Sequence, residues 1–251
     1  MRRFLIAFQF LTILPLPSPQ RFADDDLGRS TVWFPLVGLA IGGLLLLADL
    51  AFSVLFPRQL VDALLIALLA LLTGALHLDG VGDVGDGLGA RGSRERFLAV
   101  MKDSYVGAAG VVAIVLVVLL KYAALLAVPV YLKRPALLLV PMLARLTQVL
   151  VLNNARAART GGLGAAFLAG AGLGRFSLAA AYSIPLCWLL GHSAGMVALC
   201  LTMLWGIAVK RYFTQRLGGI SGDIIGFASE CAELIALLAL TATTTLLGSR
   251  L

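Results

Sequence analysis

Long apolar runs recur along the whole chain, and short polar segments separate them. An α-helix needs about 20 apolar residues to cross a bilayer, and tilt or local thinning allows a few fewer. By this measure the pattern predicts seven spans, at residues 35–56, 61–78, 106–130, 137–152, 177–190, 194–209 and 231–248, with a break at 191–193 between the fifth and sixth. No polar stretch is long enough to fold separately. We therefore expect an all-α, polytopic membrane helix bundle that forms one domain over residues 1–251.

The first apolar run is too short to be a span. It extends from Phe4 to Leu14 behind Arg2 and Arg3, and so imitates a secretory signal. Prolines follow at positions 15, 17 and 19, where a small-residue cleavage site would be needed. The run predicts an interfacial or re-entrant segment.

The composition excludes an ordinary soluble domain. Hydrophobic residues make up 60% of the chain and charged residues only 13%, whereas about a quarter of the residues in soluble domains are charged. The net charge of +7 does not indicate a nucleic-acid partner, because the basic residues are scattered singly without interleaved aromatic residues. The partner that the composition predicts is the lipid bilayer.

The basic residues predict the orientation. Lys and Arg favour cytoplasmic loops. With the N-terminus in the cytoplasm, 14 of the 20 fall in inner segments: Arg2, Arg3, Arg21, Arg29, Arg91, Arg94, Arg96, Lys102, Arg156, Arg159, Arg175, Lys210, Arg211 and Arg216. The outer segments hold four, and Lys121 and Arg145 fall inside spans. We therefore expect a cytoplasmic N-terminus.

Most acidic residues lie on the same predicted side as the basic ones. Eight of the 13 are at or just inside cytoplasmic span ends: Asp79, Asp83, Asp86, Glu95, Asp103, Asp223, Glu230 and Glu233. Asp49 lies within the first span instead. Because a charge inside the membrane needs a partner, we expect Asp49 to pair with Arg145 or Lys121.

A glycine-rich acidic segment, residues 77–87, ends the second predicted span. If the helix continues, Asp79, Asp83 and Asp86 share one face at i, i+4 and i+7. Three carboxylates so close repel one another unless cations lie between them, and Mg²⁺ prefers such hard oxygen ligands. The glycines would open the backbone to a bulky substrate. The segment predicts a magnesium site, with a plain acidic turn as the alternative.

His77 adjoins these aspartates and leaves two interpretations open. It could assist proton transfer or substrate binding, or it could be a histidine packed at a helix end.

A second candidate segment, residues 218–223, precedes the last predicted span. Ser221 and the backbone N–H groups around Gly222 could bind a phosphate, while Asp223 faces a metal. Glu230 and Glu233 could extend its acidic stripe. The alternative is an ordinary helix-start cap.

A third segment, Met101–Ser104, follows a basic stretch with Arg91, Arg94 and Arg96. Lys102, beside Asp103, and the arginines could bind substrate phosphates. The alternative is the basic flank of a short amphipathic helix at the lipid headgroups.

Together these segments resemble the cobalamin synthases, or adenosylcobinamide-GDP ribazoletransferases. The resemblance runs nearly from end to end and is strong as an ordered set. It is carried by Gln9–Thr12 with Leu14–Pro15, Trp33–Gly38, Leu76–Gly80 with Asp83 and Asp86–Gly87, Met101–Ser104, and Ser221–Asp223.

The resemblance implies a reaction in which a ribose hydroxyl of α-ribazole, or of its 5′-phosphate, attacks the cobinamide-side phosphorus of adenosylcobinamide-GDP and releases GMP. It also implies Mg²⁺ and an active site on the inner face of the cytoplasmic membrane. Carried over, it gives metal or pyrophosphate handling to Asp79, Asp83, Asp86 and Asp223. It gives phosphate or GMP contacts to Lys102 and Ser221 with their neighbours Asp103 and Gly222. Asp86 would accept the proton, with Asp83 and His77 as the other catalytic candidates.

Four positions depart from the family's pattern. Ile13 and Tyr105 stand where we expect arginine, Gly82 stands for alanine and Ser221 for threonine. Without these two basic residues the contacts with substrate phosphate or carboxylate would differ from the family's, while the acidic frame is intact.

Two other functions compete with this assignment. A CDP-alcohol phosphotransferase would carry Ala-Arg where Asp83 and Val84 stand. A cation transporter would place acids near the bilayer midplane, where only Asp49 is expected. The sequence leaves open the number of metal ions, the form of the acceptor, and whether the protein is a monomer or a homo-oligomer.

Overall fold

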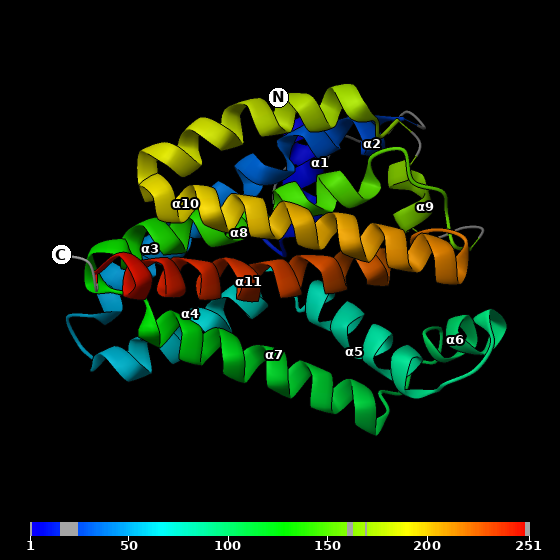
Figure 1. Ribbon diagram of the computed structural model, residues 1–251, viewed down its shortest axis with the longest axis horizontal. Helices are drawn as coiled ribbons and strands as arrows, with labels where there is room; N and C mark the ends of the chain where they lie inside the picture. Colours follow the sequence, from blue (N-terminus) through cyan, green and yellow to red (C-terminus); the bar gives the residue numbers. More distant parts are fainter. Residues whose placement is uncertain (1, 16–24, 160–162, 169, 249–251) are drawn as a thin grey trace.

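The computed structural model shows helices lying side by side, with no strand among the residues that it describes, which are 2–15, 25–159, 163–168 and 170–248 (Figure 1). The helices are α1 Arg2–Leu11, α2 Asp26–Ser30, η1 Thr31–Trp33 (a 3₁₀ turn), α3 Phe34–Phe52, α4 Arg58–Leu72, α5 Leu76–Gly89, α6 Arg94–Val100, α7 Ala108–Ala127, α8 Val130–Leu152, α9 Leu163–Leu168, α10 Leu173–Leu217 and α11 Gly222–Gly248.

Several helices are long and apolar enough to cross a membrane. Within the described ranges there are five, at Asp26–Phe52, Ala108–Ala127, Val130–Leu152, Leu173–Leu217 and Gly222–Thr243, and α4 with α5 would make a sixth if the bent pair counts as one span. The expected all-α, polytopic membrane protein is thus confirmed. The count of seven spans and the cytoplasmic N-terminus stay predictions.

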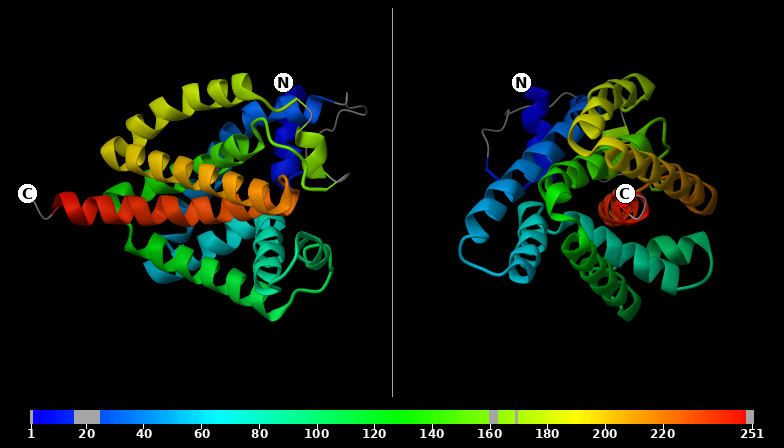
Figure 2. Two further views of the ribbon diagram at one scale, coloured as in Figure 1. Left: turned by 45° about the vertical axis from the view of Figure 1, so that its right-hand side comes forward. Right: turned by 60° about the vertical axis from the view of Figure 1, so that its left-hand side comes forward.

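α10 folds back on itself where the sequence predicted a break. His192 has φ 47° and ψ −134°, so the helical path is interrupted there. Both views in Figure 2 show the two arms of α10 meeting at a bend and diverging from it as a V. The predicted spans 177–190 and 194–209 lie one on each arm.

The second predicted span, 61–78, ends earlier than expected. α4 stops at Leu72, and the chain bends by 89° before α5 begins. Gly74 and Ala75 form the corner with φ of 61° and 53°, a left-handed conformation that alanine adopts rarely. The helix that carries the acidic residues therefore runs across the spanning helices, not along them (Figure 2, left).

The centre of the bundle is α8, which contacts α3, α10 and α11. Glycines let α3 approach it closely: a Cβ added at Gly42 would stand 2.5 Å from the carbonyl oxygen of Leu137 and 2.8 Å from Cα of Leu138. Small residues at helix contacts are typical of membrane proteins, where close packing takes over from the hydrophobic effect. α8 thus forms the core around which the other spans are placed.

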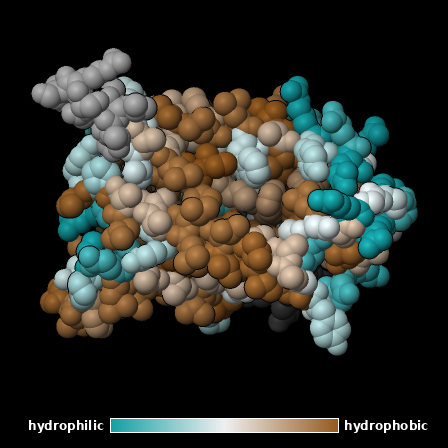
Figure 3. Space-filling model, turned by 60° about the horizontal axis from the view of Figure 1, so that its bottom comes forward, coloured by the Kyte–Doolittle hydropathy of each residue, from teal (hydrophilic) through white to brown (hydrophobic). Residues whose placement is uncertain are grey.

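The outer surface is apolar in the middle and polar at the ends. Figure 3 shows hydrophobic residues over the centre of one face and hydrophilic residues gathered towards its two ends, most densely on the right. Exposed aliphatic side chains of α7 contribute, including Val111, Val115 and Leu119. This distribution fits a bundle whose middle lies in lipid.

At the N-terminus, α1 is a ten-residue helix that packs beside α2, η1 and α3. Ile6, Ala7 and Leu11 are buried against them. An interfacial position for this segment stays a prediction.

Candidate active site

The predicted acidic stripe is present on α5. Residues 76–89 are helical, so Asp79, Asp83 and Asp86 lie at i, i+4 and i+7 and share a face. Asp79 is exposed, and the other two are partly buried.

The glycines of α5 serve contacts between helices. A Cβ at Gly85 would stand 2.8 Å from Cβ of Ala113 on α7, and one at Gly87 would stand 2.6 Å from the ring of Phe97 on α6. Gly82 lies against Ile114 in the same way. The predicted opening for a bulky substrate is therefore not what these three glycines provide.

Two glycines join the acidic stripe to the start of α11. A Cβ at Gly80 would stand 2.5 Å from the main-chain oxygen of Asp223. One turn into α11, a Cβ at Gly226 would stand 3.1 Å from Cα of His77. The two acidic segments, 144 residues apart when counted from Asp79 to Asp223, are thus brought into contact by a backbone approach that only glycine permits.

At that contact, Asp223 is bound from two sides. Its Oδ2 atom accepts a hydrogen bond from Oγ of Ser221 at 3.3 Å and lies 3.2 Å from Nη2 of Arg159. Ser221 Oγ also accepts from the N–H of Ile224 at 3.4 Å, which is the helix-start cap left open as an alternative. The side chains of Asp79, Asp83 and Asp223 together form what we call the acidic rim.

Asp83 is the carboxylate on which the other charges of the acidic rim act most clearly. The negative charges of Asp79, Asp223 and Asp86 act on its carboxylate, and Arg159 is the cation that acts on it. Sequence reasoning placed Arg159 only among the cytoplasmic basic residues. Nothing in its local pattern indicated a contact with Asp223, 64 positions away.

A two-residue pairing of loops places Arg159 there. The N–H of Ala158 donates to the carbonyl of Ile220 at 3.0 Å, and the N–H of Ile220 donates to the carbonyl of Arg156 at 2.8 Å. This isolated parallel bridge fixes the loop after α8 against the segment before α11.

The acidic residues do not by themselves enclose a metal ion. In the part of the chain that the structure describes, no three His, Cys, Asp or Glu side chains come close enough together to do so. The chemistry of the acidic rim still suits Mg²⁺, which proteins usually bind through one or two carboxylates, with substrate phosphate and water as the other ligands. Candidate ligands are therefore pairs drawn from Asp79, Asp83 and Asp223.

Asp86 bonds the start of α7. Its Oδ2 accepts from the N–H of Gly107 at 2.6 Å and its Oδ1 from the N–H of Gly110 at 2.8 Å. Both oxygens thus satisfy unpaired donors at the start of α7. This carboxylate therefore caps a helix, and the expected roles of Asp86 as proton acceptor and metal ligand stay predictions.

His77 is a packed histidine, not a residue of the acidic rim's open face. It is only 3% exposed, and its Nε2 lies 2.9 Å from Nε2 of Gln148 on α8. Its Nδ1 has no hydrogen-bond partner among the described residues. Of the two interpretations left open, the structure shows the helix-end packing.

Glu230 and Glu233 lie inside the bundle, away from the acidic rim. α11 begins at Gly222, so these residues are two and three turns into the helix. Lys121 Nζ lies 2.8 Å from Glu230 Oε2 and also bonds Glu233, which in turn binds Arg145. Asp223 and Glu230, seven residues apart on α11, share a face as expected. Glu230 and Glu233 do not join the acidic rim, however, because they pair with cations of α7 and α8.

The predicted partner of Asp49 was wrong. Asp49 lies 2.6 Å from Nη1 of Arg58, and Asp62 bonds Arg58 and lies 2.9 Å from Nζ of Lys133. Lys121 and Arg145 are instead bound by the glutamates of α11, and Asp49 shares Arg58, nine residues along the chain, with Asp62.

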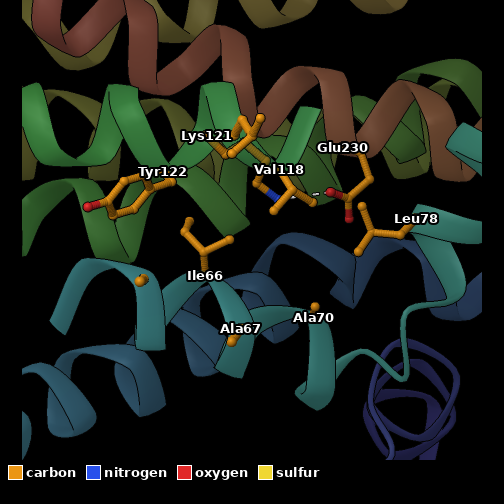
Figure 4. Close-up of a pocket in the computed structure, with 10 residues that line it drawn as sticks. Ile66, Ala67, Ala70, Leu78, Val118, Lys121, Tyr122 and Glu230 are labelled. Atoms are coloured by element: carbon orange, nitrogen blue, oxygen red, sulfur yellow. Dashed lines mark hydrogen bonds and ion pairs between the residues drawn. The ribbon is translucent and has the colours of Figure 1, made fainter. Parts of the chain in front are cut away.

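An apolar cavity of about 310 Å³ lies between α4 and α7, beside the Lys121–Glu230 pair (Figure 4). Ile66, Ala70 and Leu78 are among its lining residues, and none of the aspartates is. It is not part of the site that the acidic rim forms.

The third predicted segment forms an exposed loop after α6. Lys102 and Asp103 are exposed, and Asp103 Oδ1 accepts from the N–H of Tyr105 at 3.1 Å. Asp86, Asp103 and Tyr105 line a cavity of about 300 Å³. This loop therefore adjoins the far end of the acidic stripe.

The basic residues beside that loop differ in their contacts. Arg94 donates to the carbonyls of Leu217 at 2.7 Å and Ala158 at 3.1 Å, so it joins α6 to the loops around the acidic rim. Arg91 and Arg96 are exposed. Arg94 is thus poorly suited to the expected phosphate contact, because its guanidinium already bonds backbone oxygens.

The two positions that lost an expected arginine are both on the surface. Ile13 is 63% and Tyr105 85% exposed. Ile13 lies against the corner at Gly74, and its N–H donates to Leu72.

Sequence comparisons identify relatives along almost the full length. A relative from Geotalea daltonii is 48% identical over 96% of this chain and 98% of its own. One from Pseudomonas aeruginosa UCBPP-PA14 is 39% identical over 94% and 98%, and one from Thermoanaerobacter pseudethanolicus is 33% identical over 94% and 96%. All three are named adenosylcobinamide-GDP ribazoletransferase.

No solved structure matches the chain. The sequence model of the family described as cobalamin-5-phosphate synthase matches residues 3–241. The chain therefore belongs to the cobalamin-5-phosphate synthase family.

Proposed function

We propose that the protein is an adenosylcobinamide-GDP ribazoletransferase. It would join adenosylcobinamide-GDP to α-ribazole, or to the 5′-phosphate of α-ribazole, and release GMP. The full-length relatives with this name support the reaction. The structural observation that carries the proposal is the approach of α5 to α11 at Gly80, which gathers the acidic rim beside Arg159.

The reaction needs charge neutralisation and in-line positioning more than a nucleophile from the protein. A ribose hydroxyl oxygen forms a bond to the cobinamide-side phosphorus, and the bond from that phosphorus to the bridging oxygen breaks. GMP leaves with the bridging oxygen and its electron pair. The hydroxyl proton passes to a carboxylate, for which we propose Asp83, because Asp86 is bound to α7.

Mg²⁺ is the cofactor that we propose for this site. When bound between carboxylates of the acidic rim and the donor, it would neutralise charge on the pyrophosphate. Ser221 donates its hydroxyl proton to Asp223 across 3.3 Å, so it would orient that carboxylate; a bond from Ser221 to a phosphate oxygen would require its hydroxyl to turn away from Asp223.

We place the reaction at the inner face of the cytoplasmic membrane. The acidic rim adjoins the loop that carries Arg156 and Arg159, which is bonded to the segment before α11, and Arg91 follows the end of α5. The bias of basic residues towards cytoplasmic loops supports this side.

The structure gives no support to the transporter. The carboxylates buried within the bundle, Asp49, Asp62, Glu230 and Glu233, each bond a lysine or arginine. A transported cation would have to displace one of these partners.

GMP release by the purified chain in lipid nanodiscs tests the function. Adenosylcobinamide-GDP, α-ribazole and Mg²⁺ should give GMP, and excess EDTA should stop its release until Mg²⁺ is restored. Asp83→Asn should lower the rate at least about a hundredfold, as expected for loss of a general base. Glu95→Gln, an exposed carboxylate on α6, is the control.

The outcomes separate the candidates. If folded wild-type protein releases no GMP, the proposal is wrong. Release of CMP from a CDP-alcohol would instead favour the phosphotransferase rival.

A further inference from the structure

Arg159 is the basic side chain that contacts the acidic rim. In the described ranges, no other Lys or Arg forms an ion pair with Asp79, Asp83 or Asp223. Its Nη2 atom lies 3.2 Å from Oδ2 of Asp223, and 37% of its side chain is exposed. The guanidinium therefore reaches the acids and is open to a ligand at the same time.

The contact with Asp223 leaves most of the guanidinium unused. Arginine carries five N–H donors, and this contact uses one. No other described residue accepts a hydrogen bond from the Arg159 side chain. The remaining donors form the planar fork that binds two oxygens of a phosphate. Arg159 can thus hold Asp223 and a phosphate together.

The loop that carries Arg159 is held by main-chain bonds. The bonds between Ala158 and Ile220, and between Ile220 and the carbonyl of Arg156, do not involve the side chain at position 159. Arg94 adds a bond to the Ala158 carbonyl at 3.1 Å. The loop has its place without the Arg159 guanidinium, so an additional role for that group is open.

The positive charge of Arg159 indicates an anionic ligand. The acidic rim carries three carboxylates, and a pyrophosphate would bring more negative charge beside them. A fixed cation at the edge of the rim reduces this repulsion. We propose that Arg159 binds the pyrophosphate of the nucleotide donor, with Asp223 orienting its guanidinium. This inference rests on the proposed function, because it takes the donor to be a nucleoside diphosphate ester.

Binding of GDP and of guanosine to the full chain in lipid nanodiscs, measured by equilibrium dialysis without acceptor, separates phosphate contacts from base contacts. Arg159→Ala is expected to weaken GDP binding at least about tenfold, the loss of one charge-assisted hydrogen bond. Its guanosine affinity should not change. Arg159→Lys keeps the charge but not the planar fork of donors, so its GDP affinity should lie between those of the wild type and Arg159→Ala. Arg156→Ala, an exposed arginine of the same loop, is the matched control and should bind GDP like the wild type.

Kinetics of GMP release give a second measurement. Arg159→Ala should raise KM for the donor more than it lowers kcat, and its thermal unfolding temperature should match that of Arg156→Ala. Combination with Asp223→Asn tests the orienting role of Asp223. Replacement of Arg159 should weaken GDP binding less in that background than in the wild type.

Each contrary result has one meaning. Wild-type GDP affinity in folded Arg159→Ala overturns the inference and leaves the function standing. The same is true if GDP and guanosine weaken equally. Failure of the wild type to release GMP from the donor overturns the proposed function itself.

Discussion

Replacing Gly80 by alanine tests whether the acids of α5 and α11 work as one site. Gly80 is where the two helices meet: an added Cβ would stand 2.5 Å from the carbonyl oxygen of Asp223 and 3.1 Å from its Cα. Ordinary contact begins at 3.4 Å. The neighbours are backbone atoms of a helix start, so no side chain can rotate away. The helices must separate by about 1 Å.

The expected effect on stability is small, because two changes oppose each other. Alanine in a helix interior is favoured over glycine by about 1 kcal/mol, and an overpacked contact costs about 1–3 kcal/mol. The thermal unfolding temperature should therefore fall by only a few degrees. The effect on the reaction should be much larger, since a displacement of 1 Å in a catalytic arrangement can cost about a hundredfold in rate.

The assay is GMP release in nanodiscs together with thermal unfolding of Gly80→Ala. Gly43→Ala is the matched control, because a Cβ at Gly43 meets no atom within 4 Å and should leave the rate unchanged. A Gly80→Ala protein with wild-type activity would refute the reasoning, since it would show that the spacing of Asp79 and Asp83 from Asp223 does not matter.

Substitutions at two other positions test the roles of acids that the structure shows bonded to other helices. Asp86→Ala removes both acceptors at the start of α7 and should destabilise the protein by about 0.5–2 kcal/mol, seen as a lower unfolding temperature. Asp86→Asn keeps one acceptor and should retain most activity, and its complete inactivity would return Asp86 to the catalytic group. Glu233→Gln leaves Lys121 and Arg145 short of a buried counter-charge and should cost about 3–5 kcal/mol. A neutral effect on thermal unfolding would show that the cluster is not important for stability.

The helices could be predicted from sequence because the bilayer leaves the chain little choice. In lipid every backbone polar group must be bonded within the span, so a long apolar run has to be helical. The corner at Gly74 and Ala75 was not predicted, because Leu76 and Leu78 continue the apolar pattern across it. Hydropathy counts residues and does not detect a change of direction.

The partners of the buried charges could not be predicted, for a different reason. A charge within a span must have a partner, and the sequence indicates this for Lys121 and Asp49. Which partner it finds depends on the rotation and neighbours of each helix. Lys121 meets Glu230 across 109 positions, whereas Asp49 meets Arg58 across nine.

The glycines of α5 show a limit of motif reading. A glycine-rich acidic segment has the same sequence whether its backbone faces a substrate or another helix. In the structure Gly80 faces Asp223, and Gly85 and Gly87 face α7 and α6. The association of the motif with the site stays a prediction, and the structure shows that these glycines bring helices together.

The pairing of carboxylates separates structural acids from functional ones in this fold. Inside the bundle, Asp62 and Glu233 each bond two cations, so their charges are already neutralised.

In the acidic rim, Asp79 and Asp83 form no ion pair with any described residue, and Arg159 is the one cation on Asp223. Three acids kept close together with so little compensation repel one another. Binding of a cationic ligand would relieve this repulsion, and functional sites commonly keep such an unfavourable arrangement until the ligand binds. Mg²⁺ and a pyrophosphate bound together at the acidic rim would supply both charges that this arrangement lacks, the cation for the aspartates and the anion for Arg159.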